Sequence, residues 1–249
     1  MNIGIIGIGA IGGTIARKLV KTGHSVKVAN SRGKDAVKDF ASEIGAAPSD
    51  LSEIGEGVDV LIISIPCGAI PALPSSIFDS LSEKTIIVDT GNFYPEVRNE
   101  KIEGLGDGQV ESLWLSNLIH RPVVKTFNNL LAYSLAELGK ENGAEGRLAM
   151  QVAGDDEEQK KIVMELVDQC GFDPFDAGML ADSWKMQPTS AGYCCDYMIE
   201  ELKTVKEQSD QTPEAVAKRR AYVMTHFNEL TGGDYSHENV IRVNRENNI

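Results

Sequence analysis

A glycine-rich turn near the start of the chain constrains its fold more than any other feature. The turn, Gly7-Ile8-Gly9-Ala10-Ile11-Gly12, lies between a short apolar run at residues 3–6 and a helical pattern that ends at Gly23. In a G-x-G-x-x-G turn from strand to helix, the first glycine allows the tight turn and the second leaves room for a pyrophosphate. The third lets the helix sit close to the strand, and the free N–H groups of the helix face the phosphates. We therefore predict a dinucleotide site that includes Gly7, Gly9, Ala10, Ile11 and Gly12.

Patterns typical of strands and helices alternate through the first two-thirds of the chain. The runs at residues 58–64 and 85–89 are almost continuously apolar, as expected of central parallel strands that are covered on both faces. Further strands are predicted at 24–29, 122–129 and 147–152, and helices at 11–23, 37–44, 110–118, from 130 onward and at 162–170. The predicted fold class is α/β, with a Rossmann-type doubly wound parallel sheet.

We predict two domains. Residues 1–146 form the nucleotide-binding domain, and residues 147–249 form a smaller domain with a charged, helical tail from Asp196 onward. Within the tail, Thr212 and Pro213 have the residue types that cap and begin a helix. The next residues with helical spacing and an apolar side chain are Val216, Val223, Phe227 and Leu230. This stripe must pack against the chain's own domain or against a partner subunit, and we expect a homodimer.

The composition narrows the classes of function. A net charge of −13 argues against a general nucleic-acid or anionic-membrane binder, because both attract basic surfaces. We find no apolar run of membrane-spanning length and no signal peptide before the first strand, so we expect a cytoplasmic protein. The four cysteines lack metal-ligand spacing, and we predict ordinary thiols and no metal site.

Asn30, Ser31 and Arg32 follow the second predicted strand, at the position that decides the coenzyme. An NAD-preferring site usually has an acidic residue there, which holds the ribose 2′-hydroxyl. This chain instead offers a hydroxyl and a guanidinium that are able to bind a 2′-phosphate. Two charge-assisted hydrogen bonds of about 1.5–3 kcal/mol each favour NADP over NAD by about a hundredfold or more. We predict NADP(H) as the coenzyme, the alternative being that Arg32 is a solvated loop residue.

Several motifs follow one another along the chain. They are the glycine turn, Asn30-Ser31-Arg32, Ser64-Ile65-Pro66, Asp89-Thr90-Gly91-Asn92, Val124-Lys125-Thr126-Phe127-Asn128 and Phe172-Asp173-Pro174-Phe175-Asp176-Ala177-Gly178. In this order, over about residues 1–193, they resemble the NADPH-dependent deazaflavin reductases, which are NADP oxidoreductases that use coenzyme F420.

This resemblance implies a Rossmann domain that holds NADP and a small C-terminal domain that helps to close a cleft over a second coenzyme. A hydride then passes directly between the nicotinamide and the deazaflavin ring. By similarity, Ser31 and Arg32 take the 2′-phosphate. The residues implied at the nicotinamide are Ser64, Ile65, Pro66 and Asn92, with Asn128 close by.

The second substrate stays open, because relatives with a long tail also occur where the deazaflavin is not expected. A flavin, a ferric chelate, and a small imine or carbonyl are alternative small-molecule hydride acceptors. A reductase of an imine or carbonyl needs a proton donor that the sequence does not identify. A non-catalytic NADP sensor that binds a partner through its tail is an alternative from another class.

The sequence identifies no catalytic side chain, because hydride transfer between two bound rings needs orientation more than an acid or a base. Lys125 and Asn128 resemble the lysine and asparagine of β-hydroxyacid dehydrogenases, but we expect Lys125 at a strand end and Asn128 as the cap of the next helix. The acidic run at residues 155–158 is expected to begin a helix and to face solvent rather than bind a metal.

Overall fold

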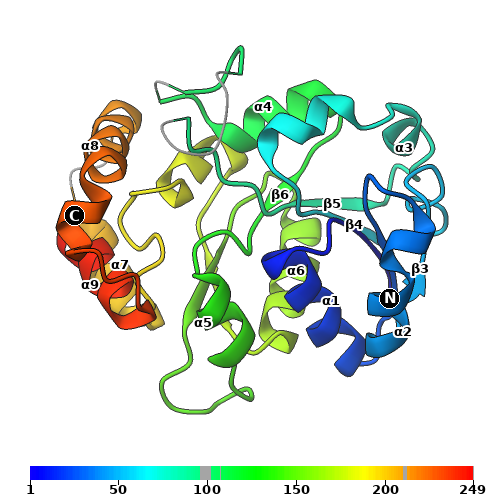
Figure 1. The fold of residues 1–249 in the computed structure, drawn as a ribbon, viewed down its shortest axis with the longest axis horizontal. Helices are drawn as coiled ribbons and strands as arrows, with labels where there is room; N and C mark the ends of the chain where they lie inside the picture. Colours follow the sequence, from blue (N-terminus) through cyan, green and yellow to red (C-terminus); the bar gives the residue numbers. More distant parts are fainter. Residues whose placement is uncertain (96–101, 107, 210–211, 249) are drawn as a thin grey trace.

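The structure, a computed structural model, describes residues 1–95, 102–106, 108–209 and 212–248. Within these residues, six parallel strands form one sheet in the order β3-β2-β1-β4-β5-β6 (Figure 1). The strands are β1 (Asn2–Ile6), β2 (Ser25–Ala29), β3 (Ala47–Pro48), β4 (Val60–Ile63), β5 (Ile86–Asp89) and β6 (Val124–Lys125). The strand order reverses between β1 and β4, as in a doubly wound sheet, so the predicted fold class is confirmed.

Helices cover both faces of the sheet (Figure 1). One face carries α3 (Ser76–Asp79) and α4 (Glu111–Ile119), and the other carries α1 (Ala10–Lys21), α2 (Lys38–Ile44) and α6 (Glu157–Gln169). Alternate side chains of β4 belong to different apolar clusters. Val60 and Ile62 pack with α1 and α6, whereas Leu61 and Ile63 pack with α3 and α4. Burial of both faces explains why the central strands are apolar at almost every position.

The register of the sheet brings the carboxyl ends of four strands level with one another. Ile6 of β1 lies opposite Ala29 of β2 and Ile63 of β4. Ile63 in turn lies opposite Asp89 of β5. The residues that follow these four strands, Gly7, Asn30, Ser64 and Thr90, therefore lie along one edge of the sheet. Open parallel sheets bind their ligands outside this edge, where the strand order reverses.

A second pair of parallel strands, β7 (Ala149–Val152) and β8 (Asp173–Asp176), is connected through α6. An antiparallel bridge between Lys125 and Ala153 links this pair to β6. Side chains of β7 and α6 share one apolar cluster with β1 and α1, so packing is continuous across residue 146. The division into domains at residues 1–146 and 147–249 stays a prediction.

Two stretches differ from the sequence predictions. The strand predicted at 122–129 is limited to the two residues of β6, because Phe127 adopts a φ of 57°, outside the β region. The helix expected after it is α5 (Ala132–Glu137). The short β3 and the half-exposed β8 carry no alternating apolar pattern, and the sequence does not predict them.

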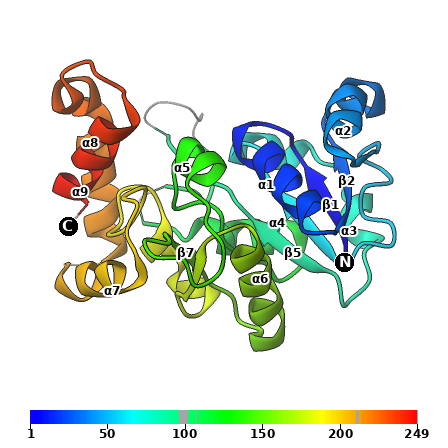
Figure 2. The same ribbon diagram turned by 90° about the horizontal axis from the view of Figure 1, so that it is seen from below.

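The tail folds into helices on the side of the molecule away from β1 and α2 (Figure 2). They are α7 (Ile199–Gln208), α8 (Pro213–Thr231) and α9 (His237–Asn247). The predicted start of α8 is confirmed, because the side chain of Thr212 accepts a hydrogen bond from the N–H of Ala215 and Pro213 occupies the first turn. In the described part of the chain, no helix combines the length and apolar character needed to cross a membrane.

The apolar stripe of α8 packs at least partly on the chain itself. Val216 and Val223 are buried, and Phe227 and Leu230 are half-buried. A partner subunit is thus not needed to cover the first two positions. The homodimer stays a prediction.

The tail also supplies hydrogen-bond donors to a buried loop at residues 187–195. Asn244 donates to the carbonyl oxygen of Cys194, at 2.8 Å. Arg245 and Asn248 donate in the same way to Cys195 and Tyr193, at 2.8 and 2.9 Å. A buried carbonyl without a partner is costly, so the tail stabilises this loop.

We expect Asn244→Ala to lower the free energy of unfolding by about 1–2 kcal/mol, because it leaves the Cys194 carbonyl buried without its donor. Denaturant unfolding of the whole chain measures this loss. Glu238→Ala, at an exposed position on the same helix, is the control and is expected to change stability by less than about 0.5 kcal/mol. Equal effects of the two substitutions would contradict the role assigned to Asn244.

Candidate functional site

The glycine turn has the geometry that the sequence predicts. Gly7 has a φ of 99°, and a Cβ atom there would lie 2.2 Å from the carbonyl oxygen of Ser64. A Cβ atom on Gly12 would lie 2.1 Å from the carbonyl oxygen of Gly7. A Cβ atom on Gly9, in contrast, would meet nothing within 4 Å. The first and third glycines are thus needed for the turn and for close packing, and the second borders open space.

The N-terminus of α1 opens onto this space. The helix begins after Gly9, and no side chain of the described residues caps it. Gly9 and Ala10 are exposed, and Ile11 is half-buried. The N–H groups of the first helical turn are therefore available to an anionic ligand, which the positive end of the helix dipole also attracts.

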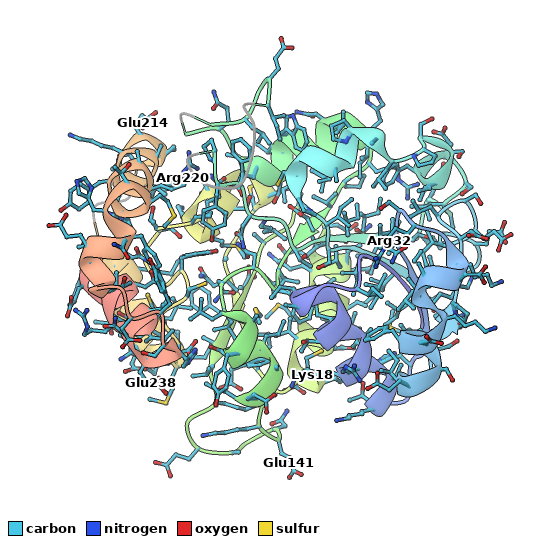
Figure 3. The ribbon with its side chains drawn as sticks, viewed as in Figure 1. Lys18, Arg32, Glu141, Glu214, Arg220 and Glu238 are labelled. Atoms are coloured by element: carbon cyan, nitrogen blue, oxygen red, sulfur yellow. The ribbon has the colours of Figure 1, made fainter. Side chains whose placement is uncertain are left out.

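The turn after β2 is fixed from both ends. The side-chain oxygen of Asn30 accepts a hydrogen bond from the N–H of Arg32, at 2.9 Å. Asp50 accepts one from the N–H of Lys34, also at 2.9 Å. Ser31 and Arg32 are exposed between these anchors, and Figure 3 shows Arg32 on the opposite side of the molecule from the tail helices. A hydroxyl and a guanidinium are thus held beside the strand edge.

The remaining predicted residues follow β4 and β5 along the same edge. Ser64 touches the glycine turn, since its side chain lies 3.0 Å from the Cβ position of Gly12. Ile65 is half-buried and Pro66 is exposed. The structure therefore brings the residues predicted from four separate motifs to one edge of the sheet. Their roles in binding stay predictions.

Asn92 and Asn128 form one contact of the site, which joins the ends of β5 and β6. The Asn128 amide nitrogen donates to the side-chain oxygen of Asn92 at 3.0 Å, and the Asn92 amide nitrogen donates to the Asn128 carbonyl oxygen at 3.1 Å. Asn128 also donates to the carbonyl oxygen of Met186, at 2.7 Å. Asn128 therefore does not cap α5, and that prediction is wrong. Its position near Asn92 agrees with the sequence analysis.

Beneath these loops lies a buried group of charged side chains, which we call the strand-end charge cluster: Asp89, Glu111, Lys125 and Arg220. Lys125 forms an ion pair with Asp89 at 3.1 Å, and both side chains are at most 4% exposed. Asp89 also accepts hydrogen bonds from Ser112 and from the N–H of Gly91. Lys125 donates in addition to the carbonyl oxygen of Gly91. Burial by itself lowers the pKa of Lys125, but Asp89 and Glu111 outweigh it and raise that pKa overall.

Glu111, at the start of α4, connects the tail to the loop that carries Asn92. Its carboxylate accepts a hydrogen bond from the N–H of Phe93 at 3.2 Å and lies 3.9 Å from the Arg220 guanidinium of α8. The second carboxylate oxygen accepts no hydrogen bond among the described residues. Burial raises the pKa of Glu111 to about 7, although Lys125 and Arg220 act in the opposite direction.

The sequence does not reveal this part of the site. Glu111 looks like an ordinary acidic residue in the first turn of a helix, and Arg220 looks like one of many charges in the tail. Both are at most 5% exposed in the fold. No local pattern separates a buried charge from a solvated one, because burial here depends on how the tail packs.

The acidic run at residues 155–158 begins α6, as predicted. Asp156 accepts hydrogen bonds from the N–H groups of Glu158 and Gln159 and so caps the helix. Asp155 accepts one from the N–H of Leu180.

A cavity of about 630 Å³ lies at the other end of α1, away from the glycine turn. Its lining includes Lys18, Lys21 and Glu141, two of which are labelled in Figure 3. Basic residues at this end of a helix are explained by the negative end of its dipole. The cavity shares no residue with the predicted coenzyme site.

Comparison with known proteins identifies the family. Residues 2–93, which extend from β1 to the loop after β5, match the model of the family described as NADP oxidoreductase coenzyme F420-dependent. Protein YjhV of Escherichia coli is 33% identical over 135 residues, which cover 53% of this chain and 86% of that protein. The chain belongs to the F420-dependent NADP oxidoreductase family.

Two further proteins are similar to much of this chain. A crystal structure from Arthrobacter, titled "putative f420 dependent nadp-reductase", matches 72% of this chain and 86% of its own chain, with a TM-score of 0.60 and 21% identity. This likeness concerns the fold. The metalloreductase STEAP3 of Rattus norvegicus is 29% identical over 187 residues, which are 75% of this chain but only 36% of that protein.

We expect Lys125→Met to lower the free energy of unfolding by about 3–5 kcal/mol, because it leaves the buried Asp89 carboxylate without its cation. Lys203→Met removes an exposed pair with Glu200 and is the control, with an expected cost below about 0.5 kcal/mol. Denaturant unfolding compares the two variants. A loss below about 1 kcal/mol for Lys125→Met would contradict a structural role for this pair.

Proposed function

We propose that this protein is an NADPH-dependent oxidoreductase that transfers a hydride between NADP(H) and a deazaflavin-type or related acceptor. The observation that carries the proposal is the strand edge itself. It combines an open helix N-terminus with an exposed hydroxyl and guanidinium after β2, and no acidic residue occupies positions 30–32. This combination suits a dinucleotide with a 2′-phosphate. Membership in a family of NADP oxidoreductases supports the same coenzyme.

Different residues of the strand edge would bind different parts of NADP(H). The N–H groups of α1 near Gly9, Ala10 and Ile11 would bind the pyrophosphate, with Gly7 and Gly12 allowing the close approach. Ser31 and Arg32 would bind the 2′-phosphate. Ser64, Ile65, Pro66 and Asn92 would border the nicotinamide, since the first three follow β4, which pairs with β1, and Asn92 follows β5, which pairs with β4. The bound coenzyme supplies the hydride.

The protein's own contribution to the reaction is orientation. Asn92 and Asn128 hold the ends of β5 and β6 together, and Met186 ties Asn128 to the C-terminal half. Lys125 is 1% exposed, and its donors are directed at Asp89 and Gly91. Lys125 therefore stabilises the loop beneath the site and does not act on the substrate. This agrees with a reaction that needs proximity more than acid–base catalysis.

We expect Arg32→Ala to weaken NADPH binding by about 10- to 100-fold and to leave NADH binding nearly unchanged, because only NADPH carries the 2′-phosphate. Titration calorimetry with both coenzymes measures the two Kd values. Lys34→Ala is the matched control on the same turn, and a smaller effect is expected. Equal losses for NADPH and NADH in Arg32→Ala would contradict the assignment.

Acceptor specificity is tested by following NADPH oxidation with a panel of acceptors. The panel contains coenzyme F420, a free flavin, a ferric chelate, and a small imine and carbonyl. We expect the fastest turnover with coenzyme F420, in line with the family's description. Faster turnover with the ferric chelate would favour the chemistry named for the metalloreductase relative. Tight NADPH binding without turnover on any acceptor would overturn the proposal and favour an NADP sensor.

A homodimeric state and a cytoplasmic location remain part of this proposal as predictions from the sequence.

A further inference from the structure

The strand-end charge cluster lies directly beneath the loops assigned to the nicotinamide. Lys125 donates to the carbonyl oxygen of Gly91, the neighbour of Asn92. Glu111 accepts from the N–H of Phe93, the other neighbour of Asn92. Cys67, at the start of the 3-10 helix η2 (Cys67–Ala72), follows Pro66, and its sulfur lies 3.4 Å from the position that a Cβ atom on Gly91 would occupy. The cluster thus supports the loop that carries Asn92, and Cys67 places the loop after β4 next to it.

The balance of charge in the cluster depends on Glu111. Lys125 and Arg220 contribute two cations, and Asp89 contributes one carboxylate. Ionisation of Glu111 adds one negative charge to this cluster, and protonation of Glu111 removes that charge. All four side chains are at most 5% exposed, so water screens this difference only weakly.

The titration of Glu111 falls near neutral pH. The groups that face it are Lys125 of β6, Asp89 of β5, Arg220 of α8 and the Cys67 thiol of η2. Burial and Asp89 raise the pKa of Glu111, Lys125 and Arg220 lower it, and the balance is a pKa of about 7. Burial raises the pKa of Cys67 to about 12, so the thiol stays neutral in this range.

We propose that Glu111 is a positioning residue whose proton sets the preference of the site for one oxidation state of its coenzyme. This inference rests on the proposed function, because it concerns the nicotinamide site. The oxidised nicotinamide ring carries a positive charge and the reduced ring does not. The negative charge that the cluster gains when Glu111 ionises therefore favours NADP⁺ relative to NADPH, and protonation of Glu111 removes this preference.

The direction of the pH effect follows from this charge balance. Raising the pH through neutrality ionises Glu111, adds a negative charge to the cluster and strengthens NADP⁺ binding relative to NADPH. Conversely, NADP⁺ bound above the cluster favours the ionised carboxyl, so Glu111 releases its proton when NADP⁺ binds. A unit charge at a separation of about 10 Å, in a medium of intermediate polarity, changes relative affinity by roughly tenfold.

The measurement is the ratio of the Kd of NADP⁺ to the Kd of NADPH at several pH values. We expect this ratio in the wild-type chain to fall by roughly tenfold between about pH 6 and about pH 8. Titration of the 2′-phosphate is common to both coenzymes and cancels in the ratio. Calorimetry in buffers of different ionisation enthalpy is expected to detect more proton release for NADP⁺ than for NADPH.

Two variants distinguish an effect of the cluster's charge on coenzyme preference from a purely structural effect. Glu111→Gln keeps the shape and holds the cluster in the charge state that it has when Glu111 is protonated, so the ratio should stay at the wild-type low-pH value at every pH. Arg220→Met removes a cation and should shift the ratio in the opposite direction, toward NADP⁺, at about pH 6. Glu165→Gln, at an exposed position on α6, is the matched control and should leave the wild-type pH profile intact.

A ratio that does not change with pH in the wild-type chain would overturn the inference, and so would a wild-type profile in Glu111→Gln. Equal weakening of both coenzymes by Glu111→Gln and Arg220→Met would also overturn it, because that result indicates a purely structural role. Failure of the wild-type chain to bind NADPH at all would contradict the proposed function itself. The two failures are therefore distinguishable.

Discussion

A buried ion pair between Lys125 and Asp89 holds together the edge of the sheet on which the site depends. The pair joins the last residues of β5 and β6, and its further hydrogen bonds fix Gly91 and the start of α4. Burying such a pair is costly unless other hydrogen bonds support it, and here Gly91 and Ser112 donate to Asp89 while Lys125 also donates to the Gly91 carbonyl. The loop with Asn92 and the loop with Asn128 leave the sheet immediately beyond this pair. Their mutual hydrogen bonds are possible only because both strands end at the same level.

Much of the α/β part of the chain was predictable from local sequence. The turn at Gly7 and Gly12 demands glycine for steric reasons that any chain with this geometry shares. The apolar runs of β4 and β5 follow from burial on both faces. The helix α6 and its cap at Asp156 follow from periodicity and from a side chain that binds free N–H groups. Each of these features depends on residues that are close together in the sequence, so it can be predicted from the sequence alone.

Other features depend on tertiary packing and were not predictable. Asn128 has the residue type of a helix cap but turns toward Asn92, because Phe127 leaves the extended conformation just before it. Glu111 and Arg220 lie about a hundred residues apart in the sequence and face each other only when the tail folds back toward the start of α4. The tail is therefore an integral part of the fold. Through Asn244, Arg245 and Asn248 it stabilises the loop at residues 187–195, whose neighbour Met186 holds Asn128.

The central claim is that the carboxyl edge of the sheet binds NADP(H). A crystal structure of the protein with NADP⁺ tests it most directly. The account predicts the pyrophosphate at the N-terminus of α1, the 2′-phosphate against Ser31 and Arg32, and the nicotinamide between Pro66 and Asn92. A coenzyme bound instead in the cavity beside Lys18, at the other end of α1, would contradict it.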